Sequence, residues 1–183
     1  ITVAALPVPM EKASGLGILQ TDERGRIVRF VEKPKDPALR ETLRMPDALR
    51  KRLNLRQGEG DCLASMGIYV FDAKVLTETL ANDRVDFGKD IIPSSIASRR
   101  VFAYPFKGYW EDIGTIGAFF EANLQITRPN PPFNFFDHEA PIYTRARHLP
   151  ASLVSGGEFK ETVIAEGCLI GAGVRMERTL VGI

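Results

Sequence analysis

The sequence predicts an α/β fold, and three observations predict it. Short β-rich runs alternate with segments of helical period over residues 1–126, a pattern typical of helices packed on a sheet. The polar, Gly-containing stretch 22–25 lies between two of these runs and predicts a hairpin. From residue 164 onwards, apolar residues recur every six positions, which is the period of a parallel β-helix. We therefore expect an α/β layer followed by the start of a β-helix.

Each expected element has its own signal. Residues 1–8 are apolar or β-branched without a helical period, which predicts a buried strand. Residues 66–71 form a second apolar run, and Asp72 after it can cap a helix. The remaining expected elements are the two hairpin strands around 22–25, a polar helix or irregular insert over 36–56, a short capped helix over 85–98, a strand over 99–110, and a helix over 116–126 that follows a strand end directly.

Composition excludes several classes of function. The formal net charge is +1, so no overall field attracts the chain to nucleic acid or anionic lipid. No apolar run reaches the ~18 residues of a membrane span, and the start lacks the basic region of a signal peptide. Cys62 and Cys168 have no C-x-x-C partner, which predicts reduced, buried thiols. These features favour an intracellular protein, in the cytoplasm or alternatively in a plastid.

The character of the chain changes after residue 127. Residues 128–150 are rich in proline and aromatic residues and predict a linker that packs on a surface. The expected domains are therefore 1–127, the linker 128–150, and the repeat region 151–183. The chain begins without Met and ends within the repeat, so we expect a piece of a longer protein.

Glu32 and Lys33 are the first candidate site residues, because they stand at the end of a predicted strand, directly before Pro34. Ligands of α/β proteins bind at the carboxyl ends of strands. A lysine suits a phosphate and a carboxylate suits sugar hydroxyl groups. A solvated charge pair at a surface turn is the alternative interpretation.

Three further residues could serve the same ligand. Ser65 opens a strand near Gly67, although serine in a strand is commonly only an edge hydrogen-bonding group. Asp112 precedes a predicted helix, where it could bind Mg²⁺ or cap the helix. Gly17 lies in a G-x-G pattern that leads into a strand, so it predicts close backbone approach to a ligand but no dinucleotide fold. No G-x-S-x-G, Walker or H-E-x-x-H motif is present, and the two histidines do not suggest a metal pair.

Several segments, taken in this order, closely resemble ADP-glucose pyrophosphorylase, also called glucose-1-phosphate adenylyltransferase. The resemblance covers essentially the whole chain. Its segments are ASGLGIL, FVEKP, LASMGIYVF, DFGKDIIP, GYWEDIGTIGAFFEANL and PIYTRARHLP.

The resemblance implies the C-terminal part of a Rossmann-like nucleotidyltransferase domain, followed by the start of a left-handed parallel β-helix. It implies synthesis of ADP-glucose and pyrophosphate from ATP and glucose 1-phosphate with Mg²⁺, for glycogen or starch, in a tetrameric, allosteric enzyme. Glu32 and Lys33 would bind glucose 1-phosphate, with Lys33 on its phosphate, and Ser65 would contact the glucosyl group. Gly17 would bring the backbone close to the sugar nucleotide, and Asp112 would bind Mg²⁺. ATP and glucose 1-phosphate are then the partners, with no nucleic acid and no membrane.

The family's Gly-rich nucleotide loop, its second metal-binding carboxylate and most of its β-helix are absent from these residues, so we expect the chain alone to be inactive. Three alternatives stay open: a catalytically silent regulatory subunit of the same enzyme, a sugar-1-phosphate nucleotidyltransferase that uses another nucleoside triphosphate, and, less favoured, a hexapeptide acyltransferase.

Overall fold

The computed structural model describes residues 1–56, 58–135 and 137–182. The chain divides into two compact units, Ile1–Gly108 and the residues from Tyr109 onwards, and each is described by itself. No helix among the described residues is long and apolar enough to span a membrane.

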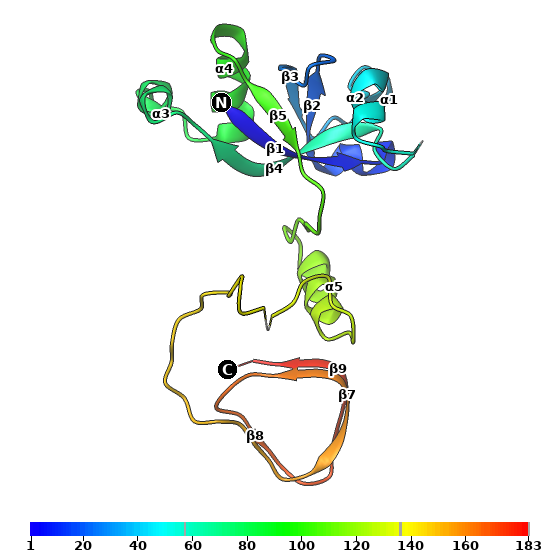
Figure 1. Cartoon of the computed structure of the whole chain (residues 1–183), viewed down its shortest axis with the longest axis vertical. Helices are drawn as coiled ribbons and strands as arrows, with labels where there is room; N and C mark the ends of the chain where they lie inside the picture. Colours follow the sequence, from blue (N-terminus) through cyan, green and yellow to red (C-terminus); the bar gives the residue numbers. More distant parts are fainter. Residues whose placement is uncertain (57, 136, 183) are drawn as a thin grey trace. The chain divides into compact units, whose positions relative to one another are not determined.

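A five-stranded mixed sheet organises the first unit (Figure 1). Its order is β3-β2-β4-β1-β5. Only the β1–β5 pair is parallel, whereas β1–β4, β2–β4 and β2–β3 are antiparallel. The strands are β1 Thr2–Val8, β2 Gly17–Thr21, β3 Ile27–Glu32, β4 Cys62–Val70 and β5 Phe102–Pro105. The predicted first strand and hairpin are confirmed, and the predicted strand over 99–110 is shorter than expected.

Short helices connect these strands, and side-chain caps start three of them. Asp36, Asp72 and Asp86 each accept a hydrogen bond from a backbone N–H of the helix that follows, which satisfies donors that a helix start leaves free. The cap predicted at Asp72 is therefore confirmed. The helical elements are η1 Met10–Gly15, α1 Pro37–Glu41, α2 Asp47–Arg52, α3 Ala73–Leu80, the π-helical turn η2 Phe87–Ile91, and α4 Ile92–Ser98.

The insert over 36–56 is part of the core. Leu43, Met45 and Leu49 are buried against residues of the sheet, and each such side chain stabilises the fold by roughly 1.5–3 kcal/mol. The sequence predicted a polar helix or an irregular insert here. The structure has two short helices. Of the three buried side chains, those of Leu43 and Met45 lie in the segment between the helices, and that of Leu49 lies in α2.

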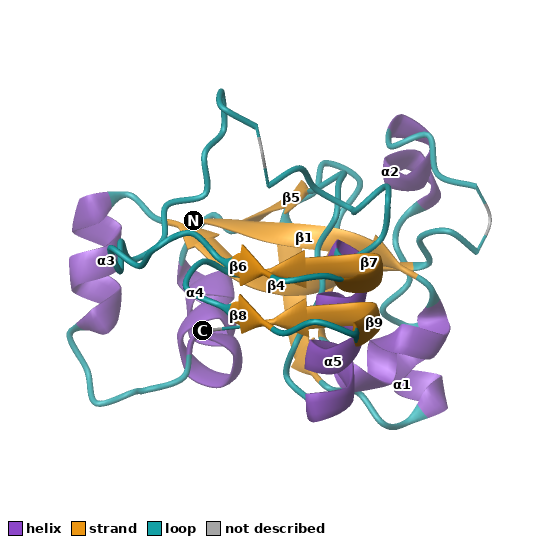
Figure 2. Ribbon diagram, turned by 90° about the horizontal axis from the view of Figure 1, so that it is seen from below, coloured by secondary structure: helices purple, strands orange, loops and turns teal. Residues whose placement is uncertain are grey.

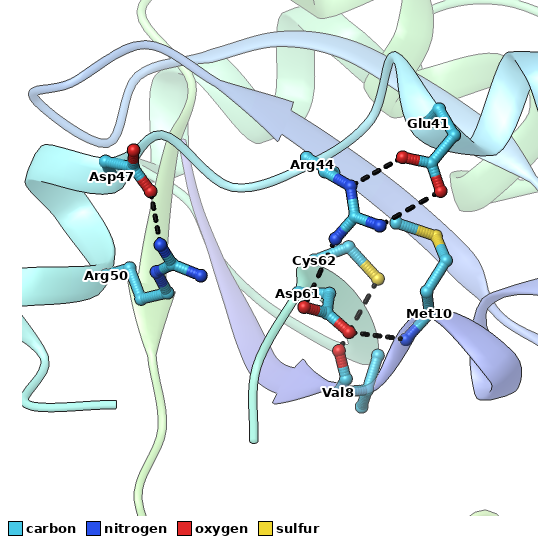
Figure 3. A network of polar contacts seen from close by, with 8 residues as sticks. All are labelled: Val8, Met10, Glu41, Arg44, Asp47, Arg50, Asp61 and Cys62. Carbon is cyan, nitrogen blue, oxygen red and sulfur yellow. Dashed lines mark hydrogen bonds and ion pairs between the residues drawn. The ribbon is translucent and has the colours of Figure 1, made fainter. Parts of the chain in front are cut away.

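A polar network holds this insert to the sheet (Figure 3). The Arg44 guanidinium lies 2.6 Å from Glu41 and 3.2 Å from Asp61, and the Asp61 carboxylate also accepts a hydrogen bond from the Met10 N–H. Beside it, burial is the main cause that raises the pKa of the Cys62 thiol to about 12. Cys62 therefore stays a protonated, unreactive thiol. Both cysteines are free, as predicted, although Cys168 is only half-buried.

The second unit contains one longer helix and two pairs of parallel strands. The helix is α5, Ile116–Ile126, and Figure 2 shows β7 beside β9 and β6 beside β8. The strands are β6 Leu153–Val154, β7 Gly157–Ile164, β8 Leu169–Ile170 and β9 Val174–Val181. Phe159 pairs with Met176, an offset of 17 residues, whereas three repeats of six predict about 18.

Two features of this unit differ from expectation. Residues 106–115, all described, contain no strand, so α5 does not follow a strand end directly. The helix also leaves large apolar side chains exposed instead of packing them on a sheet, because Ile116 is 90% exposed and Phe119 and Phe120 are each 56% exposed.

Candidate functional site

Three of the predicted residues form one row across the sheet. Glu32 of β3 pairs with Gly17 of β2, and Ile18 of β2 pairs with Ala64 of β4. Continuing that antiparallel register by one residue brings Ser65 opposite Gly17. Residues directly opposite one another in a sheet project to the same face, so Glu32, Gly17 and Ser65 share one face of three neighbouring strands.

The side chains of Phe30 and Glu32 fill the space beside Gly17. A Cβ atom at this position would lie 2.7 Å from Phe30 Cζ and 2.8 Å from Glu32 Oε2. Gly88 of η2 faces the same two groups, since a Cβ there would lie 3.6 Å from Phe30 Cζ and 3.7 Å from Glu32 Oε2. The Glu32 carboxylate thus sits between two glycines, and the backbone approaches it closely from both sides.

Lys33 extends the row beyond the end of β3. Its backbone has a φ of 47°, a left-handed conformation that costs a non-glycine residue roughly 1–2 kcal/mol. The Lys33 N–H donates to the Leu16 carbonyl oxygen at 3.0 Å, and the Nζ atom lies 3.5 Å from Glu32 Oε1. This turned backbone presents an exposed ammonium group beside a half-buried carboxylate. Strained residues of this kind are concentrated at ligand sites.

A β-bulge positions the next part of the site. Ala5 pairs with Ser65 and Val3 with Tyr69, so β4 uses four residues where β1 uses two. Gly67 lies within the bulge at a φ of 71°, and its N–H donates to Ser65 Oγ at 3.3 Å. Bulges re-aim side chains, often next to functional sites.

Tyr69 is a site residue that the sequence analysis missed. Burial raises the pKa of its hydroxyl, a hydrogen bond with Ser65 lowers it, and the nearby charges of Asp86 and Glu32 raise it. The group therefore remains a neutral phenol that can donate and accept hydrogen bonds. Its ring stacks on Phe87, with centroids 5.4 Å apart.

Asp86 was missed as well, although its segment was noticed as a family motif. Its carboxylate accepts a hydrogen bond from the Lys89 N–H at 2.9 Å, and this bond is the main cause that lowers its pKa. Asp86 is therefore an ionised carboxylate close to Tyr69. No local pattern could have found either residue, because the bulge at Gly67 interrupts the alternation of β4 before Tyr69, and Asp86 belongs to a separate segment.

Asp112 belongs to the second unit, so the row described above does not include it. Its Oδ1 atom accepts a hydrogen bond from the Gly114 N–H at 3.1 Å. The cap of α5 is Thr115, which accepts from the Ala118 N–H. Of the two roles considered for Asp112, capping the helix is therefore wrong. Nowhere in the described residues do three or more His, Cys, Asp or Glu side chains gather in a way that could hold a metal ion.

The site of the first unit combines groups that suit a sugar phosphate. Two carboxylates and two hydroxyl groups can bind sugar hydroxyls, and the ammonium group of Lys33 can bind an oxyanion. The close approach of the backbone at Gly17 and Gly88 limits the space around Glu32.

Comparison with known proteins agrees with this chemistry. Residues 1–129 match the nucleotidyl transferase family, and the chain belongs to that family. Over 188 aligned residues it is 43% identical to the glucose-1-phosphate adenylyltransferase small subunit, chloroplastic/amyloplastic, of Triticum aestivum. The predicted resemblance to ADP-glucose pyrophosphorylase is thereby confirmed. The match covers all of this chain and 39% of the wheat protein, so the chain spans about two fifths of that relative.

Proposed function

We propose that the chain is the sugar-phosphate-binding part of a glucose-1-phosphate adenylyltransferase, which forms ADP-glucose and pyrophosphate from ATP and glucose 1-phosphate. The row of Glu32, Gly17 and Ser65, with Lys33 at its end, is the observation that carries this proposal. The identity to the wheat protein, whose name states this activity, supports it.

The proposed roles follow from the chemistry of each group. Lys33 binds the phosphate of glucose 1-phosphate as a point charge. Glu32 accepts hydrogen bonds from sugar hydroxyls, and Ser65 donates to or accepts from the glucosyl group. Tyr69, hydrogen-bonded to Ser65, and Asp86 complete the wall around the sugar.

In the proposed reaction, a phosphate oxygen of glucose 1-phosphate forms a bond to the α-phosphorus of ATP, while the bond from that phosphorus to pyrophosphate breaks. The two substrates are anions that repel each other. The protein accelerates such a transfer by positioning and by neutralising charge. Lys33 reduces the repulsion on one partner and fixes the direction of the attacking oxygen.

Asp112 fits the Mg²⁺ that this chemistry uses. Mg²⁺ is commonly held by one or two carboxylates together with substrate phosphates, so a full protein cluster is unnecessary. One oxygen of Asp112 accepts the Gly114 N–H, and the other is available to the ion. When bound, Mg²⁺ neutralises charge on the phosphates.

The proposal extends to the rest of the molecule. The parallel pairs β6–β8 and β7–β9 support a left-handed β-helix that starts after a linker at 128–150. A homo- or heterotetramer is proposed for the full-length protein, in line with the wheat relative's name as a small subunit. That name also carries the words chloroplastic/amyloplastic, which supports the plastid alternative to the cytoplasm.

Replacing Lys33 tests the phosphate role. In the full-length enzyme, Lys33→Ala should raise the KM for glucose 1-phosphate about 10- to 100-fold, because a hydrogen bond to a charged group contributes about 1.5–3 kcal/mol. The KM for ATP should change far less. Steady-state kinetics with each substrate varied in turn measures both values.

Lys35→Ala is the matched control. Lys35 is an exposed lysine two positions away, and its Nζ donates to the Ser14 carbonyl oxygen at 2.9 Å. This variant should leave both KM values unchanged. Equal increases for the two substrates in Lys33→Ala would contradict the assignment.

A screen of ATP, UTP, GTP and dTTP with the full-length protein separates the alternatives. Turnover with ATP supports the proposal. Preference for another nucleotide indicates a different sugar nucleotidyltransferase, and absence of turnover with all four indicates a regulatory subunit.

A further inference from the structure

A pocket lies in the first unit, between β3 and α4. Its volume is ≈ 510 Å³, within the range of about 300–1,000 Å³ that small-molecule sites occupy. Helix α4 packs against β3, which is one of the two edge strands of the sheet. We call this cavity the β3–α4 pocket. Val28, Phe30, Pro93 and Ile96 form its apolar part, and Arg26 and Arg29 form its charged part.

The two arginines are available to a ligand. Both side chains belong to exposed residues, and within residues 1–56, 58–135 and 137–182 neither guanidinium has a hydrogen bond or an ion pair. Asp22 also lines the pocket, but its Oδ1 atom accepts hydrogen bonds from the N–H groups of Arg24 and Arg26. One oxygen of the Asp22 carboxylate is thus used by the hairpin turn, and the pocket combines the two positive charges of Arg26 and Arg29 with the one negative charge of Asp22.

The pocket borders the sugar-phosphate site, since Phe30 lines the pocket and also lies beside Gly17, but the polar groups of that site are not part of it. None of Gly17, Glu32, Lys33 and Ser65 lines it. Arg29 and Lys33 are four positions apart along the chain, which corresponds to roughly 13 Å in extended conformation. A single phosphate group therefore cannot bind Lys33 and the two pocket arginines at the same time.

We propose that the β3–α4 pocket binds a small organic oxyanion, a phosphate or a carboxylate on an apolar body. Guanidinium groups match both kinds of oxyanion, because they donate parallel hydrogen bonds to two oxygens. The apolar body lies against Phe30 and Ile96, where its burial adds affinity. Inorganic phosphate lacks this second contact and binds more weakly.

Isothermal titration calorimetry on the full-length protein tests the proposal with three probes: phenyl phosphate, benzoate and inorganic phosphate. All titrations use the Lys33→Ala background, so that the sugar-phosphate site does not contribute. Phenyl phosphate or benzoate should bind, and Arg26→Gln combined with Arg29→Gln should weaken binding about tenfold or more. The tighter of the two organic probes identifies the preferred head group.

Two further variants complete the design. Arg24→Gln removes an exposed arginine of the same turn that does not line the pocket, and it should bind the probes like its parent. Ala97→Phe places a ring in the pocket, which Ala97 lines, and it should abolish binding. Unchanged melting temperatures show that each variant is folded.

Three results would overturn the inference. The first is no binding of either organic probe at millimolar concentration. The second is binding that the double arginine variant leaves unchanged. The third is equal affinity for inorganic phosphate and phenyl phosphate, which would remove the proposed apolar contact.

Discussion

At the scale of single residues, the geometry of the site depends on how the side chains of Phe30 and Glu32 pack beside Gly17 of β2. Gly17 stands where any Cβ would overlap Phe30 and Glu32. Such overpacking typically costs about 1–3 kcal/mol. An alanine here would force Phe30 or Glu32 to move, which is a second reason for glycine besides the close ligand approach that the sequence predicted.

A pair of glycine substitutions tests this requirement. Gly17→Ala should lower the free energy of unfolding by about 1–3 kcal/mol and raise the KM for glucose 1-phosphate, because Glu32 must move. Gly15→Ala is the control, since nothing lies within 4 Å of a Cβ atom at that position. Chemical denaturation and steady-state kinetics measure the two effects. Equal destabilisation by both substitutions would show that the contacts at Gly17 are not the cause.

The residues of the site differ in how far the sequence could predict them. Glu32 and Lys33 could be proposed because a strand visibly ends there, Gly17 because of its G-x-G pattern, and Ser65 because it lies near Gly67. Tyr69 was not predictable in this role, because it depends on a bulge that changes the pairing of β4. Asp86 comes from a separate segment, and only the tertiary fold brings its charge near Tyr69.

At the scale of elements, caps and bulges decide where the side chains of the site point. The turn η2 begins at Asp86, whose carboxylate accepts the Lys89 N–H. This bond is also the main reason that the pKa of Asp86 lies below its ordinary value of 3.8. A carboxyl group with a lowered pKa in the folded state stabilises the protein above its unfolded pKa, and this contribution is lost as the pH falls through the folded value.

The pH dependence of stability should therefore change in Asp86→Asn. Asparagine keeps an oxygen that can cap the turn, but it does not titrate. The loss of stability on acidification below pH 3.8 should be smaller in the variant than in the parent. Melting temperatures between neutral pH and pH 3 measure the difference.

Asp83→Asn is the comparison for this experiment. Within the described residues, the Asp83 carboxylate has no hydrogen bond or ion pair. Its replacement should leave the pH profile as it is in the parent. A profile shifted equally by both substitutions would mean that net charge, and not the cap, controls the acid response.

The elements themselves were predicted best where local signals were strong. The hairpin and the Asp72 cap were predictable because turn and cap residues act within a few positions. The insert over 36–56 was only partly predictable, since its two helices are too short to show a clear period. Its place in the core depends on Leu43, Met45 and Leu49 meeting distant strands.

At the scale of the whole molecule, the chain carries one thiol in each compact unit. Cys62 is buried in the first unit, and burial raises its pKa to about 12. Cys168 in the second unit is only half-buried. The thiolate is the reactive form of cysteine. The reaction rate of each cysteine therefore indicates whether the unit that contains it is folded.

Alkylation with iodoacetamide at pH 8 should therefore modify Cys168 first. Cys62 should react only when the first unit opens, so its rate should rise steeply with denaturant. Peptide mapping by mass spectrometry follows each site, and Cys62→Ser identifies its peptide. Similar rates for the two cysteines in native buffer would contradict the buried position of Cys62.

Each of the paired strands β7 and β9 contains one residue with a left-handed backbone, and these two bends have a consequence for how the second unit forms. Glu161 and Arg178 occupy equivalent places in these strands, and both have left-handed backbones, with φ of 50° and 48°. Neither is glycine, so each bend is locally unfavourable by roughly 1–2 kcal/mol. Lys160 pairs with Glu177 and Thr162 pairs with Thr179, so the pairing of the two strands holds both bends on either side. We therefore expect the two turns to be acquired together, in a single cooperative step, and not one after the other along the chain.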